Sequence, residues 1–276
     1  MYIGIDLGGT SIRAGVVGST GKILNQQAVR CNAAGSETEV LEQIFALIEG
    51  VLTPEVKGMG IGVPSVVDAE KGIVYNAVNI PSWKEVHLKE ILEKRFSLPV
   101  EVNNDCNCFS LGVSRFGEAG GVGSVVCVTL GTGVGSTLVL DGKVFNGHNT
   151  GAGEIGSIPY LEYDYERYCS SRFFTDAGTT GKEAADAVTQ SGSEESLRLW
   201  DTFGTHVGNL VKLILFAYDP EMIVFGGSIA KAFPLFSESM WRTVRTFPYP
   251  ATVDRIRIVP TTMESAGLIG AACLVM

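Results

Sequence analysis

Tyr2-Ile3-Gly4-Ile5-Asp6-Leu7-Gly8-Gly9-Thr10 opens the chain with a short apolar run, an aspartate and a glycine-rich turn, and a second apolar run follows at residues 12–17. The same order returns at mid-chain, where residues 124–130 lead into Gly131-Thr132-Gly133-Val134-Gly135 and then into residues 137–140. Short apolar runs bounded by glycine predict strands, and the repeat of strand, glycine turn and strand predicts two related halves. We therefore expect an α/β protein of two lobes with a cleft between them, each lobe with a glycine hairpin at its inner edge.

Further patterns predict the remaining elements. Residues 23–29 predict a third strand, which makes the first three strands an antiparallel meander. Ser36 with Glu39, and Ser82 with Glu85, have the spacing of a capping box and predict two helices. Later segments predict strands at 59–63, 100–102, 222–225 and 255–259, and helices at 105–116, 194–217 and 265–274.

The length of 276 residues suits two lobes of ordinary domain size. We expect a smaller N-terminal lobe over residues 1–106, with the C-terminal helix 264–276 packed on it. Residues 107–263 are expected to form the larger lobe.

Charge and composition exclude several classes of function. The formal net charge is −9, whereas a nucleic-acid surface needs clustered Lys and Arg, so we expect no nucleic-acid partner. No stretch approaches roughly 18 uninterrupted apolar residues, which predicts no membrane span. Six scattered cysteines without a C-x-x-C pair, and an N-terminus without a basic or apolar leader, indicate reduced thiols in the cytoplasm.

The two glycine turns are candidate phosphate-binding sites. Because glycine has no Cβ, Gly8 and Gly9 let the backbone N–H groups of the first turn, up to Thr10, approach a phosphate. Asp6, at the end of the preceding strand, is placed to hold Mg²⁺ through water. The second turn offers the same feature at Gly131, Thr132, Gly133 and Gly135. For either turn alone, a simple connection between strands is an equal alternative, but the match between the two favours phosphate binding.

Other phosphate motifs do not fit the sequence. Gly181-Lys182 is followed by Glu183, and Asp176 stands where the first glycine of a Walker loop belongs. Residues 151–156 match G-x-G-x-x-G, but no clear strand precedes them and no βαβ unit surrounds them. We therefore expect no dinucleotide site.

Val102-Asn103-Asn104-Asp105 places a carboxylate between a predicted strand and a predicted helix. An aspartate at such a point is commonly only a helix cap. Asp105 also follows the sheet of the first lobe and precedes the second glycine hairpin. That place in the order of parts makes it a candidate catalytic carboxylate.

Together and in this order, the segments resemble the ROK family of bacterial sugar kinases, within the actin–hexokinase superfamily, over nearly the whole chain. Residues 6–10 and 130–135 resemble the two phosphate loops of that family, and Gly226-Gly227-Ser228 its adenosine motif. Residues 60–64 and 79–83 are similar to its sugar-side loops, 103–107 to the segment of its catalytic aspartate, and 153–156 to that of its sugar-binding glutamate. The resemblance implies a two-lobed actin/hexokinase-like (ribonuclease H-like) fold with a cleft between the lobes.

The resemblance also implies ATP-dependent phosphorylation of a hexose hydroxyl, with Mg²⁺ and with Asp105 as the general base. The implied ATP-binding residues are Asp6, Gly8, Gly9, Thr10, Gly131, Thr132, Gly133, Gly135, Gly226 and Gly227. The implied sugar-binding residues are Ser65, Asn79, Asn104, Asp105, Glu154, Ser157 and Glu166. A solvated helix charge is an equal alternative for Glu166.

The sequence departs from the family at one place. Ser157 stands where members usually have His after Glu-Ile-Gly, and residues 158–165 contain no Cys or His in place of the usual zinc loop. Zinc needs about four N or S ligands, so we expect no zinc. The shorter serine predicts a looser selection among sugars.

We expect a glucokinase-like ATP:hexose phosphotransferase, with N-acetylmannosamine, N-acetylglucosamine or fructose as alternative substrates. A non-catalytic, sugar-sensing ROK protein is the alternative of another class. ROK repressors carry a winged helix before the first phosphate hairpin, and we expect none here because Asp6 lies close to the start of the sequence. A homodimer is expected by family analogy.

Overall fold

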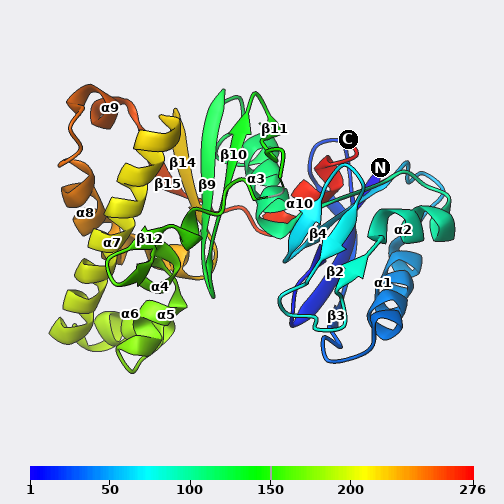
Figure 1. The fold of residues 1–276 in the computed structure, drawn as a ribbon, viewed down its shortest axis with the longest axis horizontal. Coiled ribbons are helices and arrows are strands. Elements are labelled where there is room, and N and C mark those ends of the chain that lie inside the picture. Colours follow the sequence, from blue (N-terminus) through cyan, green and yellow to red (C-terminus); the bar gives the residue numbers. More distant parts are fainter. Residues whose placement is uncertain (150) are drawn as a thin grey trace. The chain divides into compact units, whose positions relative to one another are not determined.

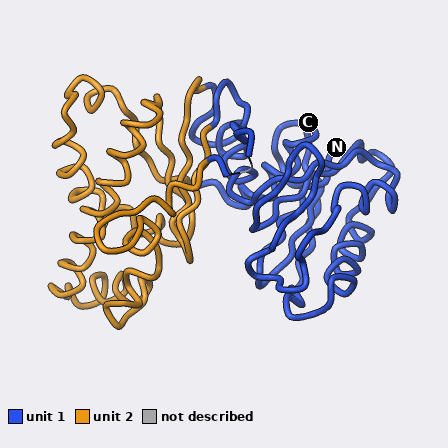
Figure 2. The backbone as a smooth tube through the Cα atoms, in the orientation of Figure 1, with its two compact units in different colours: residues 1–121, 139–152, 262–276 blue, residues 122–138, 153–261 orange. Residues whose placement is uncertain are grey.

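The computed structural model describes residues 1–149 and 151–276, in which two compact units are distinguished (Figure 2). Unit 1 comprises residues 1–121, 139–152 and 262–276, and unit 2 comprises residues 122–138 and 153–261. The expected lobe boundary after residue 106 falls inside unit 1 and stays a prediction.

Unit 1 is built on a five-stranded sheet with the strand order β3-β2-β1-β4-β8 (Figure 1). Its strands are β1 (Tyr2–Leu7), β2 (Ser11–Val17), β3 (Ile23–Arg30), β4 (Met59–Val63) and β8 (Val100–Asn104). The first three strands are antiparallel neighbours, which confirms the predicted meander. β4 joins β1 in parallel, and β8 joins β4 in parallel.

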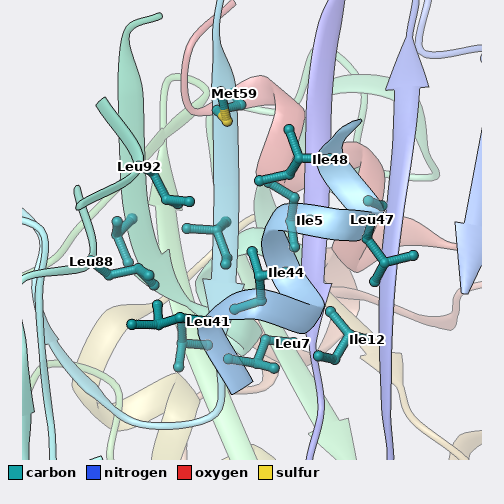
Figure 3. Close-up of a cluster of buried hydrophobic side chains, with 14 of the residues drawn as sticks. Ile5, Leu7, Ile12, Leu41, Ile44, Leu47, Ile48, Met59, Leu88 and Leu92 are labelled. Atoms are coloured by element: carbon teal, nitrogen blue, oxygen red, sulfur yellow. The ribbon is translucent and has the colours of Figure 1, made fainter. Parts of the chain in front are cut away.

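The other elements of unit 1 are short strands and helices. The strands are β5 (Val66–Asp68), β6 (Ile73–Tyr75), β7 (Glu85–Val86) and β11 (Lys143–Val144), and the helices are α1 (Glu37–Val51), α2 (Leu88–Phe96), α3 (Asp105–Phe116) and α10 (Ala266–Cys273). The predicted capping box of α1 is confirmed, because Ser36 accepts from the Glu39 N–H and Glu39 accepts from the Ser36 N–H. The apolar face of α1 includes Ile44 and Ile48, which lie in one buried cluster with Ile5 of β1 (Figure 3). Burial of each such side chain contributes about 1.5–3 kcal/mol.

The second predicted capping box, Ser82 with Glu85, is wrong. Glu85 lies in β7, which pairs with β6, and α2 begins only at Leu88. The side chains of Trp83 and Val86 are fully buried in the core of unit 1. Their burial is worth several times the roughly 1 kcal/mol of a helix cap, so the segment stays extended.

Helix α10 packs on β1, β4 and α3. At the contact points, glycine residues allow the backbones to approach closely. A Cβ on Gly60 of β4 would lie 1.8 Å from the Ala271 carbonyl oxygen. A Cβ on Gly270 would lie 1.6 Å from the Cys108 carbonyl oxygen of α3. A side chain larger than hydrogen at either position would force α10 away from its neighbours, so glycine allows the C-terminal helix to pack closely on the sheet that carries the first glycine hairpin.

Unit 2 contains most of the sheet β11-β10-β9-β14-β15. Its strands are β9 (Ser124–Leu130), β10 (Val134–Leu140), β12 (Pro159–Tyr160), β13 (Tyr163–Asp164), β14 (Met222–Gly226) and β15 (Arg257–Pro260). Its helices are α4 (Tyr165–Cys169), α5 (Ser171–Asp176), α6 (Gly181–Ser191), α7 (Glu194–Tyr218), α8 (Phe233–Val244) and α9 (Pro250–Arg255), with short 3₁₀ turns η1 (Ile155–Ser157) and η2 (Ile229–Ala232).

The long predicted helix is confirmed as α7, which ends where Asp219 adopts a left-handed conformation (φ 41°) directly before Pro220. Trp200 and Phe203 of α7 are buried in the core of unit 2 with Phe236 of α8. Within the described residues, no helix combines the length and the apolar character that a membrane crossing requires.

Candidate active site

The first glycine hairpin connects β1 to β2 in unit 1. The Gly8 N–H donates to the Ser11 carbonyl oxygen at 2.9 Å, which closes the turn. A Cβ on Gly9 would lie 2.5 Å from the Cβ of Asn79, so the hairpin and the loop that carries Asn79 are packed together. Two segments that the sequence assigned to phosphate and to sugar are thus neighbours, although 70 residues separate them.

Asp6 lies in β1 directly opposite Arg13 of β2. The Arg13 guanidinium pairs with Asp6 Oδ2 at 2.5 Å, and the Asp6 side chain is 19% exposed. Arg13 was missed in the sequence. The signal was available, because a turn between Leu7 and Ser11 brings the residues on either side into register.

Asn104, not Asp105, caps helix α3. Its Oδ1 accepts from the N–H groups of Cys106 and Asn107 at 2.8 and 3.3 Å, and its Nδ2 donates to the Ser65 carbonyl oxygen at 3.1 Å. Asp105 follows as the first residue of the helix. Asp105 Oδ1 also accepts from the Cys106 N–H at 2.8 Å, whereas Asn104 reaches both the Cys106 and the Asn107 N–H. The Asn104 amide has a second N–H besides the one that bonds to Ser65.

Ser65 links the end of β4 to this helix start. Its hydroxyl is buried and donates to the Tyr75 carbonyl oxygen at 2.5 Å, while its own carbonyl accepts from Asn104. The predicted sugar-side residues Ser65 and Asn104 are thus brought together with Asp105.

The carboxylates of Asp6 and Asp105 both act on Cys108, a buried thiol of α3. Burial raises the pKa of Cys108 well above its usual value, and the negative charges of Asp105 and Asp6 raise it further. Gly62 of β4 lies opposite Asp6, and a Cβ on it would lie 3.1 Å from Cys108 Sγ and 3.5 Å from Asp105 Cα, so both aspartates lie in one neighbourhood of unit 1.

The second glycine hairpin lies in unit 2, and the Gly226-Gly227 turn lies against it. A Cβ on Gly227, whose φ is +87°, would lie 2.3 Å from the Leu130 carbonyl oxygen at the end of β9. A Cβ on Gly131 would lie 3.9 Å from Ser228 Oγ. The structure therefore joins the two segments that the sequence assigned to phosphate and to adenosine.

Glu166 of α4 lies on the same hairpin. Its Oε2 accepts from the Val134 N–H at 3.2 Å, and its Oε1 is 3.7 Å from Arg172 Nη1. A Cβ on Gly133 would lie 2.5 Å from Glu166 Oε2, so a larger residue at this position would displace the carboxylate. Glu166 is thus an anchored residue and not simply a solvated helix charge.

Glu154 directly precedes the 3₁₀ turn η1 and Ser157 is its last residue, and both are exposed. A hydrogen bond from β10 fixes the start of this turn: the Ser136 hydroxyl donates to the Gly153 carbonyl oxygen at 2.7 Å. The Ser157 N–H donates to the Glu154 carbonyl oxygen at 3.2 Å. The backbone thus presents these two side chains to solvent on one turn.

An aromatic cluster follows where the sequence lacks the zinc loop. Tyr160 of β12 stacks on Tyr165 of α4, with ring centroids 4.3 Å apart, and contacts Tyr168 and His206 edge-on. The Tyr160 hydroxyl accepts from Asn209 at 3.0 Å and lies 3.2 Å from His206 Nδ1. Burial raises the pKa of Tyr165 to about 12. Among the residues that the structure describes, no group of three or more His, Cys, Asp or Glu is arranged to hold a metal.

We expect His206 to make the stability of the protein dependent on pH. Burial lowers its pKa below the usual value, so the unfolded chain binds a proton more readily than the folded one. The neutral, buried His206 should therefore contribute to the free energy of unfolding above the unfolded pKa of about 6.5. This stabilisation should be lost as the pH falls through the folded pKa. Urea unfolding at pH 7.5 and at pH 5.5 measures it.

His206→Gln should lose less stability on acidification than the parent, whereas His148→Gln, at an exposed histidine of unit 1, should behave like the parent. Equal acid sensitivity in the parent and in His206→Gln would contradict this prediction.

Two units built on open mixed α/β sheets, each with a glycine hairpin after its first strand, define the actin/hexokinase-like class of proteins. The sequence profile of the ROK family matches residues 2–276, and the chain belongs to that family. The resemblance inferred from the motifs is thereby confirmed.

Three relatives illustrate the range of similarity. The glucokinase of Thermotoga maritima is 29% identical over 306 residues, covering 99% of this chain and 96% of that protein. The xylose repressor of Caldicellulosiruptor bescii is 26% identical, covering 99% of this chain and 77% of that protein. The crystal structure of a ROK family glucokinase from Streptomyces griseus in complex with glucose and AMPPNP is 26% identical, with a TM-score of 0.82 over 99% of this chain and 98% of that one.

Proposed function

We propose that this protein is an ATP-dependent sugar kinase that transfers the γ-phosphoryl group of ATP to a hexose hydroxyl. The observation that carries the proposal is the place of Asp105, at the first residue of α3 beside a cap supplied by Asn104. Its family membership and the similarity to the two glucokinases support the same activity.

In the proposed reaction, the Asp105 carboxylate accepts the proton of the sugar hydroxyl as the hydroxyl oxygen attacks the γ-phosphorus. One P–O bond forms to the sugar and the bond to the β-phosphate oxygen breaks, giving a sugar phosphate and ADP. The remaining N–H of Asn104 is available to donate to a neighbouring sugar hydroxyl. Asn79, packed on Gly9, brings the sugar loop to the phosphate hairpin of unit 1.

Asp6 fits the proposed role toward hydrated Mg²⁺. Carboxylate oxygen is a ligand that Mg²⁺ and its water shell accept, and the side chain is partly open to solvent. Among the described residues, Arg13 is paired with Oδ2, while no hydrogen bond is made to Oδ1. Bound Mg²⁺ would neutralise phosphate charge, and Asp6 would hold its water shell while Arg13 orients the Asp6 carboxylate.

In unit 2, the hairpin residues Gly131, Thr132, Gly133 and Gly135 are proposed to bind phosphate, and Gly226 with Gly227 the adenosine end of ATP. Glu154, Ser157 and Glu166 are proposed to contact sugar hydroxyls. Oε2 of Glu166 is engaged by the Val134 N–H and Oε1 is paired with Arg172, so a sugar hydroxyl would share Oε1 with the guanidinium. The absence of zinc, a cytoplasmic location and a homodimer remain predictions.

A sugar-sensing protein without turnover is the second candidate, favoured by the similarity to the xylose repressor. Such a protein would bind sugar but release no ADP.

ADP release measured with ATP, Mg²⁺ and a panel of sugars tests both candidates. We expect turnover with glucose or with at least one of N-acetylglucosamine, N-acetylmannosamine and fructose, and no turnover without Mg²⁺. Sugar binding in calorimetry without ADP release from any sugar would favour the sensing function and contradict the kinase.

A further inference from the structure

Three asparagine side chains of unit 1 bond to one another around Asp105. Asn103 and Asn107 stand two residues before and two residues after it, and Asn146 comes from the loop after β11. Asn103 Nδ2 donates to Asn146 Oδ1 at 3.2 Å. Asn107 Nδ2 donates to Asn103 Oδ1 at 2.7 Å and to Asn146 Oδ1 at 3.2 Å. We call these three residues the amide cluster.

The backbone sets the orientation of the amide cluster. The Asn104 N–H donates to Asn103 Oδ1 at 2.8 Å, and a backbone N–H can only donate, so the oxygen of Asn103 must face it. The NH₂ group of Asn103 then faces Asn146, which must present its oxygen. Asn146 therefore acts only as an acceptor toward Asn103 and Asn107.

Burial makes these bonds matter. Asn103 is only 5% exposed, and a buried amide left without its hydrogen-bond partner is destabilising. Asn107 is also fixed through its backbone N–H, which donates to Asn104 Oδ1. Hydrogen bonds on both sides of Asp105 thus fix the junction of β8 and α3. Within the amide cluster, Asn146 is the residue that comes from a distant part of the chain.

We propose that Asn146 is a positioning residue for the catalytic base. By accepting from Asn103 and Asn107, it holds the first turn of α3 so that the Asp105 carboxylate meets the hydroxyl proton in the productive orientation. This inference rests on the proposed kinase function. Because a misplacement of about 1 Å can cost up to about 10²-fold in rate, loss of the acceptor should appear in kcat.

The test compares Asn146→Ala with Asn146→Asp, using the sugar that the panel identifies. Asn146→Ala removes the acceptor at an exposed position, so no core cavity opens. We expect kcat to fall about tenfold, with the KM for ATP unchanged within about twofold. Asn146→Asp keeps two acceptor oxygens and should recover most of kcat. Lys143→Ala, three residues earlier on the exposed side of the same connection, should match the parent.

Hydrogen exchange of the Cys106 and Asn107 amides gives a readout that needs no turnover. It should quicken in Asn146→Ala and return to the parental rate in Asn146→Asp. Equal kcat loss in both variants, or a kcat loss without quicker exchange, would overturn the positioning role.

The two proposals fail in different ways. Normal kcat in Asn146→Ala, beside an Asp105→Asn variant that has lost activity, would overturn the inference and leave the kinase standing. A parent protein that phosphorylates no sugar would overturn both.

Discussion

Replacing Asp105 by asparagine should lower kcat by roughly 10²-fold or more, the usual scale for loss of a general base. Asparagine keeps the size and much of the hydrogen bonding of aspartate but cannot take a proton from the sugar hydroxyl. The helix start should survive, because Asn104 supplies the cap. The KM for sugar should therefore change far less than kcat, as measured by ADP release over a range of sugar concentrations.

Asp254→Asn, at an exposed carboxylate of α9, is the matched control and should retain parental kcat. Near-normal kcat in Asp105→Asn on the preferred sugar would remove Asp105 from the mechanism.

Gly270→Ala should lower the free energy of unfolding by about 3 kcal/mol, the upper end of the usual cost of overpacking. The added Cβ would stand 1.6 Å from the Cys108 carbonyl oxygen, and the atom it meets is backbone, which cannot rotate away. Helix α10 would have to move off α3. Urea denaturation of the purified variant measures the loss.

Gly267→Ala provides a control in the same helix, since its Cβ would lie 3.5 Å from the nearest atom, Asp6 Oδ2. Both substitutions replace glycine with alanine in a helix and gain up to about 1 kcal/mol in helix propensity. The two variants therefore differ in whether the new Cβ collides with a neighbouring backbone atom. Gly267→Ala should be as stable as the parent or slightly more stable. Equal unfolding midpoints for the two variants would contradict the close packing of α10 on α3.

Much of the fold was predictable because local rules governed it. The meander of β1, β2 and β3 followed from apolar runs separated by short glycine turns. The capping box of Ser36 and Glu39 and the stop of α7 at Asp219-Pro220 depend on neighbours in the chain. Where burial competed with a local signal, as at Ser82 and Glu85, the local rule failed.

The candidate site was predictable only as a set of segments. The order of glycine turns, Asn-Asn-Asp and Gly-Glu-Ile-Gly led to the family, and the family profile confirms that resemblance. Assigning the cap was harder, because Asn104 and Asp105 are both good capping residues and adjacent. Which of the two residues caps α3 depends on which side chain accepts from both the Cys106 and the Asn107 N–H and also donates to the Ser65 carbonyl oxygen. The sequence alone does not give those distances.

The sequence by itself determined the two glycine hairpins, the strands and helices with strong periodicity, the family, and the carboxylate between a strand and a helix. Only the tertiary structure decided that Arg13 faces Asp6, that Glu166 rests on the second hairpin, and that Asn146 bonds Asn103 from 43 residues away. The reason is physical. Periodicity and caps arise within a few residues, whereas the partner of a buried polar group is set by which distant segments the packed sheets and helices bring within about 3 Å of it.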